Sequence, residues 1–401
     1  HGHVAEAPRT AVLLRRACCV VQTAPLCIYV LLLWYGNPQL DGDWLHWNHE
    51  VLPHWREDVR TQHQVTSGVK FLPPEEVHSP FYPLLGCYSS RNETLLRNHF
   101  QSMAEMGIGS AVISWWGRPT LDGTIDSQGV NTDSLVLSVL DAAVGTGVGI
   151  AFHLEPYEGR TALSVASDIH YLHDQYGKHQ SLHRMNCRHG SALPVYFVYD
   201  SYRIASDEWA KVLSREGSHS IRGTAADGCF IALWLDPNDG PAISNGHFDG
   251  FYSYFASEGT SYASTTSNWK SMASFAEENG LLFIPSVGPG YDDSKIRPWN
   301  RAATKDREGG AYYRRMWKEA LEAGATSVSI TSFNEWGEGT QIEPAVPKVA
   351  AEGARLPPDV REALALKADG QYSDYSPGSP FLYAEITAEH IAQLGVQHQE
   401  L

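Results

Sequence analysis

Short apolar runs that alternate with amphipathic stretches constrain the fold of this 401-residue chain more than any other feature of its sequence. Most of these runs are hydrophobic without a break, which is typical of parallel strands covered on both faces. The eight predicted strands are residues 26–34, 110–115, 148–153, 194–199, 228–235, 250–255, 281–287 and 327–333.

The stretches between these runs have the spacing of helices that bury one face. The predicted helices are residues 94–106, 133–144, 165–176, 208–214, 269–278 and 312–323. Strands and helices that alternate in this way fit a (β/α)8 barrel, the TIM-barrel form of the α/β class, better than a doubly wound sheet. A dinucleotide-binding sheet would carry a G-x-G-x-x-G turn after an early strand, and the chain has no such turn.

The sequence divides into a short N-terminal segment and one catalytic domain. We expect the barrel with its long loops to occupy residues 26–401, with the alanine-rich, charged stretch 348–370 as a surface insertion. Residues 1–25 form either an arm or part of a membrane anchor. Residues 17–35 are almost uncharged and follow basic side chains, as in a signal anchor. We favour a buried strand for residues 26–34, because the chain runs on from there directly into a structured motif.

The charge balance excludes one class of partner. Lys and Arg total 30 while Asp and Glu total 46, which gives a formal net charge of -16. A protein that binds a phosphate backbone needs a surplus of basic side chains, so we expect no nucleic acid partner. The 12 Trp, 19 Tyr and 13 Phe side chains fit either stacking on sugar rings or ordinary core packing.

Three glutamates follow predicted strands at the edge where such a barrel places its chemistry. Glu155 follows the third strand, and Glu335 and Glu338 follow the last. Taken singly, each also fits a solvated loop charge. Together they provide what glycosidic cleavage needs, because one carboxyl group protonates the leaving oxygen while an ionised one acts as base or nucleophile. Proximity of two carboxylates separates their pKa values in this direction.

Histidine and cysteine positions do not form a metal-binding pattern. His46 and His49 lie three residues apart, a spacing compatible with ligation, but no third ligand follows at a characteristic distance. The six cysteines include no C-x-x-C pair. We therefore predict that the active site holds no metal ion.

Motifs at these strand ends resemble those of glycoside hydrolase family 99, the endo-α-1,2-mannosidases, and in particular their animal Golgi branch. The likeness covers about residues 34–345 and resumes at residues 372–387. The matching motifs are Trp34-Tyr35-Gly36-Asn37-Pro38, His46-Trp47-Asn48-His49, Phe81-Tyr82-Pro83, Tyr88-Ser89-Ser90-Arg91, His153-Leu154-Glu155-Pro156-Tyr157, Tyr199-Asp200-Ser201-Tyr202, Phe248-Asp249-Gly250, Pro285-Ser286-Val287-Gly288-Pro289-Gly290-Tyr291, Ile296-Arg297-Pro298-Trp299-Asn300, and Ser332-Phe333-Asn334-Glu335-Trp336-Gly337-Glu338-Gly339-Thr340-Gln341-Ile342-Glu343.

The resemblance implies a retaining endo-cleavage of an α-mannoside next to a 1,2-linkage, which releases a glucosylated mannose oligosaccharide from an N-glycan. Glu335 would remove the proton of the substrate's own 2-hydroxyl, which attacks the anomeric carbon and forms a 1,2-anhydro sugar. Glu338 would be the general acid and then the base for water. The predicted substrate-binding residues are Glu155, Tyr252, Arg297, Trp115, His153, His46 and Tyr202.

The resemblance also bears on cofactors, partners and location. It implies no cofactor, a mannose oligosaccharide or high-mannose N-glycan as partner, and a Golgi membrane location with the catalytic domain in the lumen. We expect a monomer. One glycosylation sequon, Asn92-Glu93-Thr94, gives weak support to a secretory route.

Two stretches depart from the family pattern. The family's first strand is rich in tyrosine before Trp34, with one tyrosine in the site, whereas this chain has Val30-Leu31-Leu32-Leu33. Either the N-terminus comes from an alternative or misassigned exon, or a contact in the site is lost. The second departure is Ser114-Trp115-Trp116-Gly117-Arg118-Pro119, where the family more often has a Trp-Tyr-Pro-Pro loop. This departure bears on which sugar is accepted.

Two other interpretations stay open from the sequence. One is a glycan-binding protein that keeps the cleft but has lost turnover through its altered first strand. The other is a barrel glycosidase with a covalent nucleophile. The retained glutamate pair argues against the first, since a lectin has no need of a proton donor.

Overall fold

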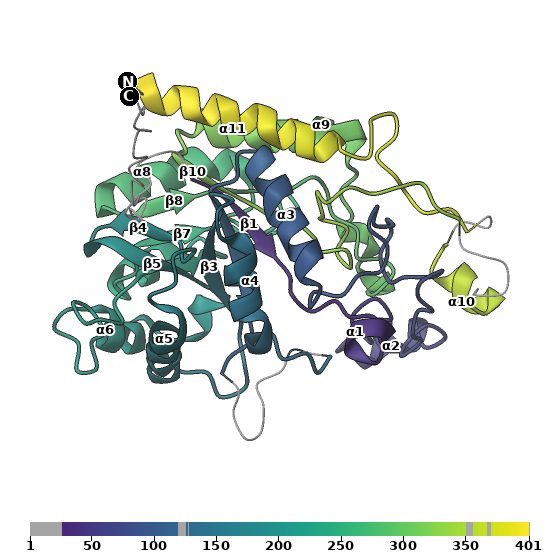
Figure 1. Ribbon diagram of the computed structural model, residues 1–401, viewed down its shortest axis with the longest axis horizontal. Coiled ribbons are helices and arrows are strands. Elements are labelled where there is room, and N and C mark those ends of the chain that lie inside the picture. The colour runs from purple at the N-terminus through teal and green to yellow at the C-terminus, as the bar shows by residue number, and fades with distance from the viewer. Residues whose placement is uncertain (1–25, 119–125, 127, 350–355, 367–369, 401) are drawn as a thin grey trace, which may run out of the picture.

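The computed structural model describes residues 26–118, 126, 128–349, 356–366 and 370–400 (Figure 1). The arm or anchor predicted for residues 1–25 lies outside the described residues. Within the described part of the chain, no helix is both long enough and apolar enough to cross a bilayer.

A parallel sheet that closes on itself forms the centre of the molecule. Its strand order is β8-β7-β6-β5-β3-β2-β1-β10-β9. β8 (Leu282–Ile284) and β9 (Ser286–Val287) are halves of one predicted strand, separated by Pro285. Proline has no N–H for a sheet ladder, which accounts for the break. Because the sheet starts and ends on the same segment, the eight predicted strands form the expected (β/α)8 barrel.

The remaining barrel strands agree with the apolar runs to within a few residues. They are β1 (Leu26–Leu31), β2 (Ser110–Trp115), β3 (Gly149–Leu154), β5 (Gly190–Val198), β6 (Cys229–Leu233), β7 (Gly250–Tyr252) and β10 (Ser327–Ile330). One strand was not predicted. β4 (Arg184–Cys187) pairs antiparallel with the start of β5, and its Arg-Met-Asn-Cys sequence lacks an apolar run.

Alternate residues of the strands face two different cores, as the period of two requires. Side chains such as Ile28, Val112 and Ile231 fill the inside of the barrel. Their neighbours, such as Ala111 and Ile113, pack outward against the helices. The strands are therefore buried on both faces, which explains why their sequences are hydrophobic without a break.

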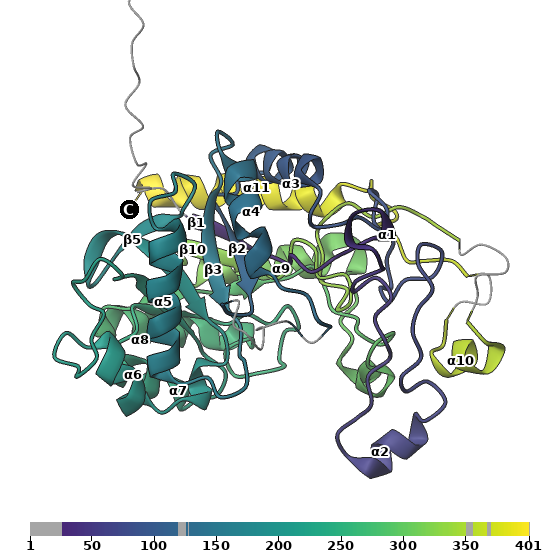
Figure 2. The ribbon, with the colours of Figure 1, turned by 60° about the horizontal axis from the view of Figure 1, so that its bottom comes forward.

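From each connection between neighbouring barrel strands, one helix packs against the outside of the barrel (Figures 1 and 2). They are α3 (Glu93–Glu105), α4 (Val136–Ala143), α5 (Ala162–Tyr176), α6 (Ser206–Leu213), α7 (Asp239–Asn245), α8 (Trp269–Asn279) and α9 (Ala311–Glu322). Only α7 was not predicted, because Gly240 and Pro241 are poor helix formers. The glycine fits close packing, since a Cβ there would lie 2.5 Å from the Trp234 ring.

The last helix, α11 (Leu382–Glu400), lies beside α9 in both views (Figures 1 and 2). The hydroxyls of Tyr313 and Thr387 join the two helices at 3.0 Å, and the rings of Trp317 and His390 stack at 5.5 Å. The C-terminal helix α11 therefore belongs to the barrel's outer layer.

Long loops form a separate lobe beside the barrel. This lobe carries α1 (Pro38–Asp41), α2 (Glu57–Gln62) and α10 (Pro358–Ala363) (Figure 2). The described part of the insertion at 348–370 is held there by a small apolar cluster of its own. Val360, Leu356 and Leu364 pack against Val51 and Phe71. The insertion therefore contributes to the wall of this lobe.

Candidate active site

The loop after β10 carries both predicted catalytic glutamates and is tied to the end of the first strand. The Asn334 side chain accepts a hydrogen bond from the Leu32 N–H at 2.8 Å and donates one to the Leu32 carbonyl at 3.0 Å. The Tyr35 hydroxyl donates to the Asn334 carbonyl at 2.9 Å. These three bonds fix the start of the loop against the barrel.

A buried polar network supports the same loop from below. The Glu343 carboxylate accepts hydrogen bonds from the Tyr88 hydroxyl at 2.7 Å and the Trp336 indole at 3.1 Å, and His99 Nε2 lies 3.1 Å away. Buried polar groups that are fully bonded rigidify their surroundings. The residues between Asn334 and Glu343 therefore have little freedom to move.

Glu335 and Glu338 lie on this loop in different electrostatic surroundings. Arg297 Nη1 lies 3.1 Å from Glu338 Oε1 and 3.1 Å from Asp293 Oδ2. Burial raises the pKa of Glu335 well above its ordinary value, and the Glu338 charge raises it further. Burial also raises the pKa of Glu338, while Arg297 lowers it. In the free protein the pair therefore retains a proton above the usual glutamate range, and Arg297 favours the charge on Glu338.

The third predicted carboxylate belongs to a hydrogen-bonded chain across the barrel mouth. Glu155 Oε1 accepts a bond from the Ser114 hydroxyl at 2.8 Å and lies 2.7 Å from His153 Nδ1. His153 Nε2 lies 2.8 Å from the Tyr252 hydroxyl. Since Tyr252 is 1% exposed, it supports the floor of the site through His153.

Tyr254 was not selected from the sequence, although it belongs to the aromatic cluster that ends the predicted strand at 250–255. Its ring lies 4.8 Å from that of Tyr199 and 5.6 Å from that of His153. Burial raises the pKa of Tyr254 most. The nearby Tyr199 raises this pKa further, followed by the charges of Glu338, Glu155 and Glu335 in decreasing order. All three predicted carboxylates therefore act electrostatically on this one hydroxyl.

The backbone at Tyr254 also marks the position as unusual. Its φ of 57° lies in the left-handed region, which a bulky side chain rarely adopts. Such conformations gather at functional sites, where surrounding contacts hold them in place. Tyr254 is thus a candidate site residue that the sequence indicated only through its aromatic neighbours.

His46 lies among aromatic rings on the β1 side of the site. It stacks on Trp34 at 4.5 Å with the rings parallel to within 1°, and its Nε2 lies 2.6 Å from Asp126 Oδ2. Burial lowers the pKa of His46, and it lowers that of His49 to about 4. The charge of Arg297 adds to the lowering at His49.

Two predicted substrate-binding residues occupy other positions. Trp115 is 1% exposed and faces the outer core, where its indole donates to Asp133 at 2.8 Å and stacks on Tyr171. Its placement does not support contact with a substrate. Tyr202 is 42% exposed, in the turn that follows β5 close to Tyr199. Tyr202 is therefore available to a ligand at the rim.

The altered first strand is intact in the structure. Val30, Leu31, Leu32 and Leu33 are all at most 4% exposed and pack in the hydrophobic core. These four side chains supply no hydroxyl group, so any contact made by a tyrosine of the family at one of these positions is missing here.

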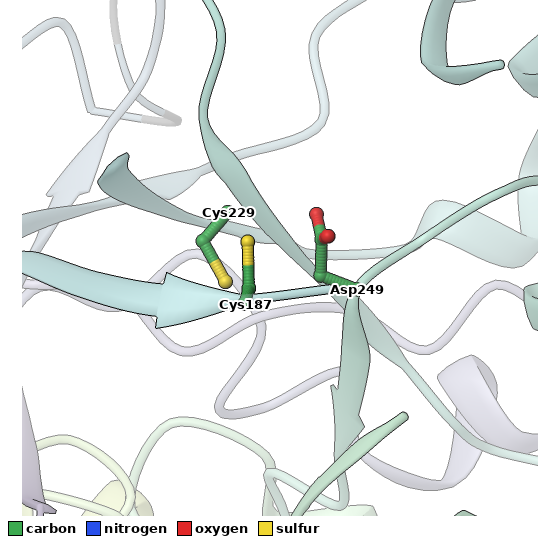
Figure 3. Close-up of side chains that lie close together, drawn as sticks. All are labelled: Cys187, Cys229 and Asp249. Carbon is green, nitrogen blue, oxygen red and sulfur yellow. The ribbon is translucent and has the colours of Figure 1, made fainter. Parts of the chain in front are cut away.

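One group in the described part of the chain has the composition of a metal site. Cys187, Cys229 and Asp249 each offer a ligand atom, and these atoms lie within 4.8 Å of one another (Figure 3). The group lies at the amino ends of β6 and β7, opposite the glutamates. Asp249 Oδ2 accepts hydrogen bonds from Arg222 and from the Phe230 N–H, both at 2.8 Å. The Arg222 charge opposes a second cation there, and an active site without metal stays a prediction.

A closed (β/α)8 barrel with two interacting, partly buried glutamates at the carboxyl ends of its strands defines a barrel glycoside hydrolase. The comparisons with known proteins specify the family. The chain matches the model of glycosyl hydrolase family 99 over residues 26–394. It therefore belongs to this family.

Relatives and solved structures agree with this assignment. The chain is 42% identical over 364 residues to a Danio rerio protein named glycoprotein endo-alpha-1,2-mannosidase-like protein, covering 90% of this chain and 77% of that protein. It is 42% identical over 354 residues to the glycoprotein endo-alpha-1,2-mannosidase of Rattus norvegicus, covering 88% and 71%. The GH99 endo-alpha-mannosidase structure from Bacteroides thetaiotaomicron matches with a TM-score of 0.79 and 38% identity, covering 92% and 98%.

Replacing Glu335 with Gln should stabilise the fold at neutral pH and have little effect in acid. Because the pKa of Glu335 is raised on folding, the native protein loses stability as pH rises from the unfolded value of about 4.3 through the folded one. Glutamine does not titrate. Melting temperatures of both proteins at pH 4 and pH 7.5 measure the difference, with Glu278→Gln on the exposed face of α8 as the control. A difference that does not widen with pH would contradict the raised pKa.

Hydrolysis should survive exhaustive chelation. The predicted acid and base are the two glutamates, which need no metal, and the Cys187 group lies at the opposite end of the barrel. Activity is measured before and after EDTA treatment, with elemental analysis of the purified protein. Loss of activity that Zn²⁺ or Ca²⁺ restores would show that a required metal was missed.

Proposed function

We propose that this protein is a retaining endo-α-1,2-mannosidase that releases glucosylated mannose oligosaccharides from N-glycans. The observation that carries the proposal is the Glu335 and Glu338 pair beside Arg297 on a rigid loop. The names of the relatives from Danio rerio and Rattus norvegicus support the proposed identity of the bond that is cleaved.

In the proposed reaction the substrate supplies its own nucleophile. Glu335 takes the proton of the 2-hydroxyl of the cleaved mannose as that oxygen attacks the anomeric carbon, and Glu338 gives its proton to the departing oxygen. Water then attacks the anomeric carbon of the 1,2-anhydro sugar, with Glu338 as its base, and Glu335 returns the proton to O2. Two inversions at one carbon give net retention.

These roles require the proton of the pair to be on Glu338, whereas Arg297 favours it on Glu335 in the free protein. A bound 2-hydroxyl that donates to Glu335 stabilises its ionised form, while the glycosidic oxygen accepts from a protonated Glu338. Arg297 keeps Asp293 as a partner, so its charge stays compensated when Glu338 is neutral. Substrate binding and the position of the proton are therefore coupled.

The remaining residues position the sugar. Glu155 follows β3 and Tyr254 follows β7, at the same end of the barrel as the pair, and Arg297 fixes Glu338. His153 and Tyr252 hold Glu155 from beneath.

A covalent route is the second candidate, and the proton distribution of the free protein favours it. In that route Glu335, which retains the proton, would protonate the leaving oxygen, and Glu338 would attack the anomeric carbon. The two routes differ in whether O2 is needed and in which carboxylate is labelled.

Further parts of the proposal concern the setting of the enzyme. We infer a Golgi location with the domain from residue 26 onward in the lumen, an N-terminal arm or anchor before it, and a monomeric state. Asn92 of the sequon is exposed at the start of α3, where its side chain caps the helix through the Leu95 N–H.

Replacing Glu338 with Gln should abolish cleavage of a glucosylated high-mannose N-glycan, because general acid catalysis contributes about 10²–10⁴-fold. The first step on a mannoside with an acidic phenol leaving group should fall far less, since that group needs little protonation. Released oligosaccharide is measured by mass and phenol by absorbance. Equal losses on both substrates would remove Glu338 from the acid role.

A substrate whose cleaved mannose lacks the 2-hydroxyl should bind but not turn over. Most contacts remain, whereas the attacking oxygen is absent. Calorimetry measures binding, and product analysis measures turnover. Rapid hydrolysis of the 2-deoxy substrate, or a fluorosugar adduct mapped by mass spectrometry to Glu338 or Glu335, would favour the covalent route.

A further inference from the structure

Trp55 exposes more of its surface than any other large hydrophobic residue in the described part of the chain. It is 77% exposed, ahead of Val396 at 57%. It lies on the long loop between α1 and α2, in the lobe beside the barrel mouth (Figure 2). Tryptophan is enriched at binding interfaces, so an exposed indole beside the barrel mouth is a candidate contact for a ligand.

The ring is held by its neighbours rather than free to rotate. It stacks on His54 at 3.8 Å and meets the edge of Trp299 at 5.3 Å and 83°. His54 is itself 8% exposed, and the Trp299 indole donates to the Leu52 carbonyl at 3.1 Å. With one face on His54 and most of its area exposed, Trp55 presents a rigid flat platform on the other face.

This platform is joined to the catalytic pair through the Arg297 loop. Trp299 is two residues from Arg297, whose guanidinium lies 3.1 Å from Glu338, so its backbone is within about 7 Å of that of Arg297. The Leu52 N–H donates to the Ile296 carbonyl at 2.7 Å, which fixes the two loops to each other. The Trp55 ring and Glu338 are therefore joined through the single segment that carries Arg297 and Trp299.

The surroundings of Trp55 suit a sugar face. Arg56 and Asp58, the latter in α2, form an exposed ion pair beside it at 2.6 Å, so the ring has a charged, hydrated border. A pyranose has one apolar face rimmed by hydroxyls, which matches a single aromatic ring with polar neighbours. A protein partner or a bilayer needs a wider continuous apolar surface.

We propose that Trp55, braced by His54 and Trp299, is an outer subsite that stacks on a distal sugar of the glycan whose scissile bond lies at Glu335 and Glu338. The proposal rests on the proposed function and adds to it a reason for preferring long glycans. Because the contact is remote from the reacting bond, it acts equally on bound substrate and transition state, and it changes KM rather than kcat.

The test compares two substrates that are cleaved at the anomeric carbon of the same kind of mannose, a glucosylated high-mannose N-glycan and a short aryl glycoside. Trp55→Ala should lower kcat/KM for the N-glycan about tenfold through KM, as expected for loss of an aromatic stacking contact, and leave the short substrate unchanged. Trp55→Phe should keep most of the activity. Phe381→Ala, at an exposed position before α11, is the matched control.

Binding is measured in parallel, so that the proposal does not depend on turnover. In a Glu338→Gln background, calorimetry should show weaker N-glycan binding when Trp55→Ala is added. If wild-type protein cleaves neither substrate but this difference remains, the proposed function fails and the subsite stands. Unchanged N-glycan affinity, equal losses on both substrates, or a change only in self-association or vesicle binding would overturn the subsite.

Discussion

The pair of hydrogen bonds between the Asn334 side chain and the Leu32 backbone is the interaction on which the site depends. It joins the chain beyond β1 to the chain beyond β10, the two strands that meet in the sheet. Both bonds use backbone groups that would otherwise end a strand without partners, so they serve stability and position together. The closure of the barrel therefore fixes the start of the loop that carries Glu335 and Glu338. The hydrogen bonds to Glu343 fix the far end of the same loop.

Holding two carboxyl groups close together in a partly buried loop costs stability, which the surrounding network offsets. Each glutamate has a raised pKa because burial penalises its charged form, and the Arg297 charge lowers both pKa values while pairing directly with Glu338. The result is one retained proton and one charge, which is the state that glycosidic cleavage requires. Arg297 forms salt bridges with both Glu338 and Asp293. It therefore stabilises the charge on Glu338 and keeps an ionised partner when Glu338 is neutral.

Continuous apolar runs allowed the barrel strands to be predicted, and their ends located the glutamate pair. Features that depend on contacts between distant segments were missed, such as β4, which forms only by pairing with β5, and the proximity of Tyr254 to three carboxylates. The placement of Trp115 differs from its predicted place in the substrate-binding site for a simpler reason. The Ser114 hydroxyl faces inward to Glu155, and since side chains alternate along a strand, Trp115 faces outward. A position at a strand end therefore predicts how far along the barrel axis a residue lies, but not whether its side chain points into the barrel or out of it.

The same geometry bears on the hypothesis that the leucine-rich first strand has abolished catalytic turnover. β1 pairs in register with both β2 and β10, and the four apolar residues from Val30 to Leu33 are buried as core. The bonds that position the catalytic loop use the backbone of Leu32, which any side chain at that position supplies. Both bonds of this joint are present despite the altered side chains. The altered sequence therefore leaves the support of Glu335 and Glu338 in place.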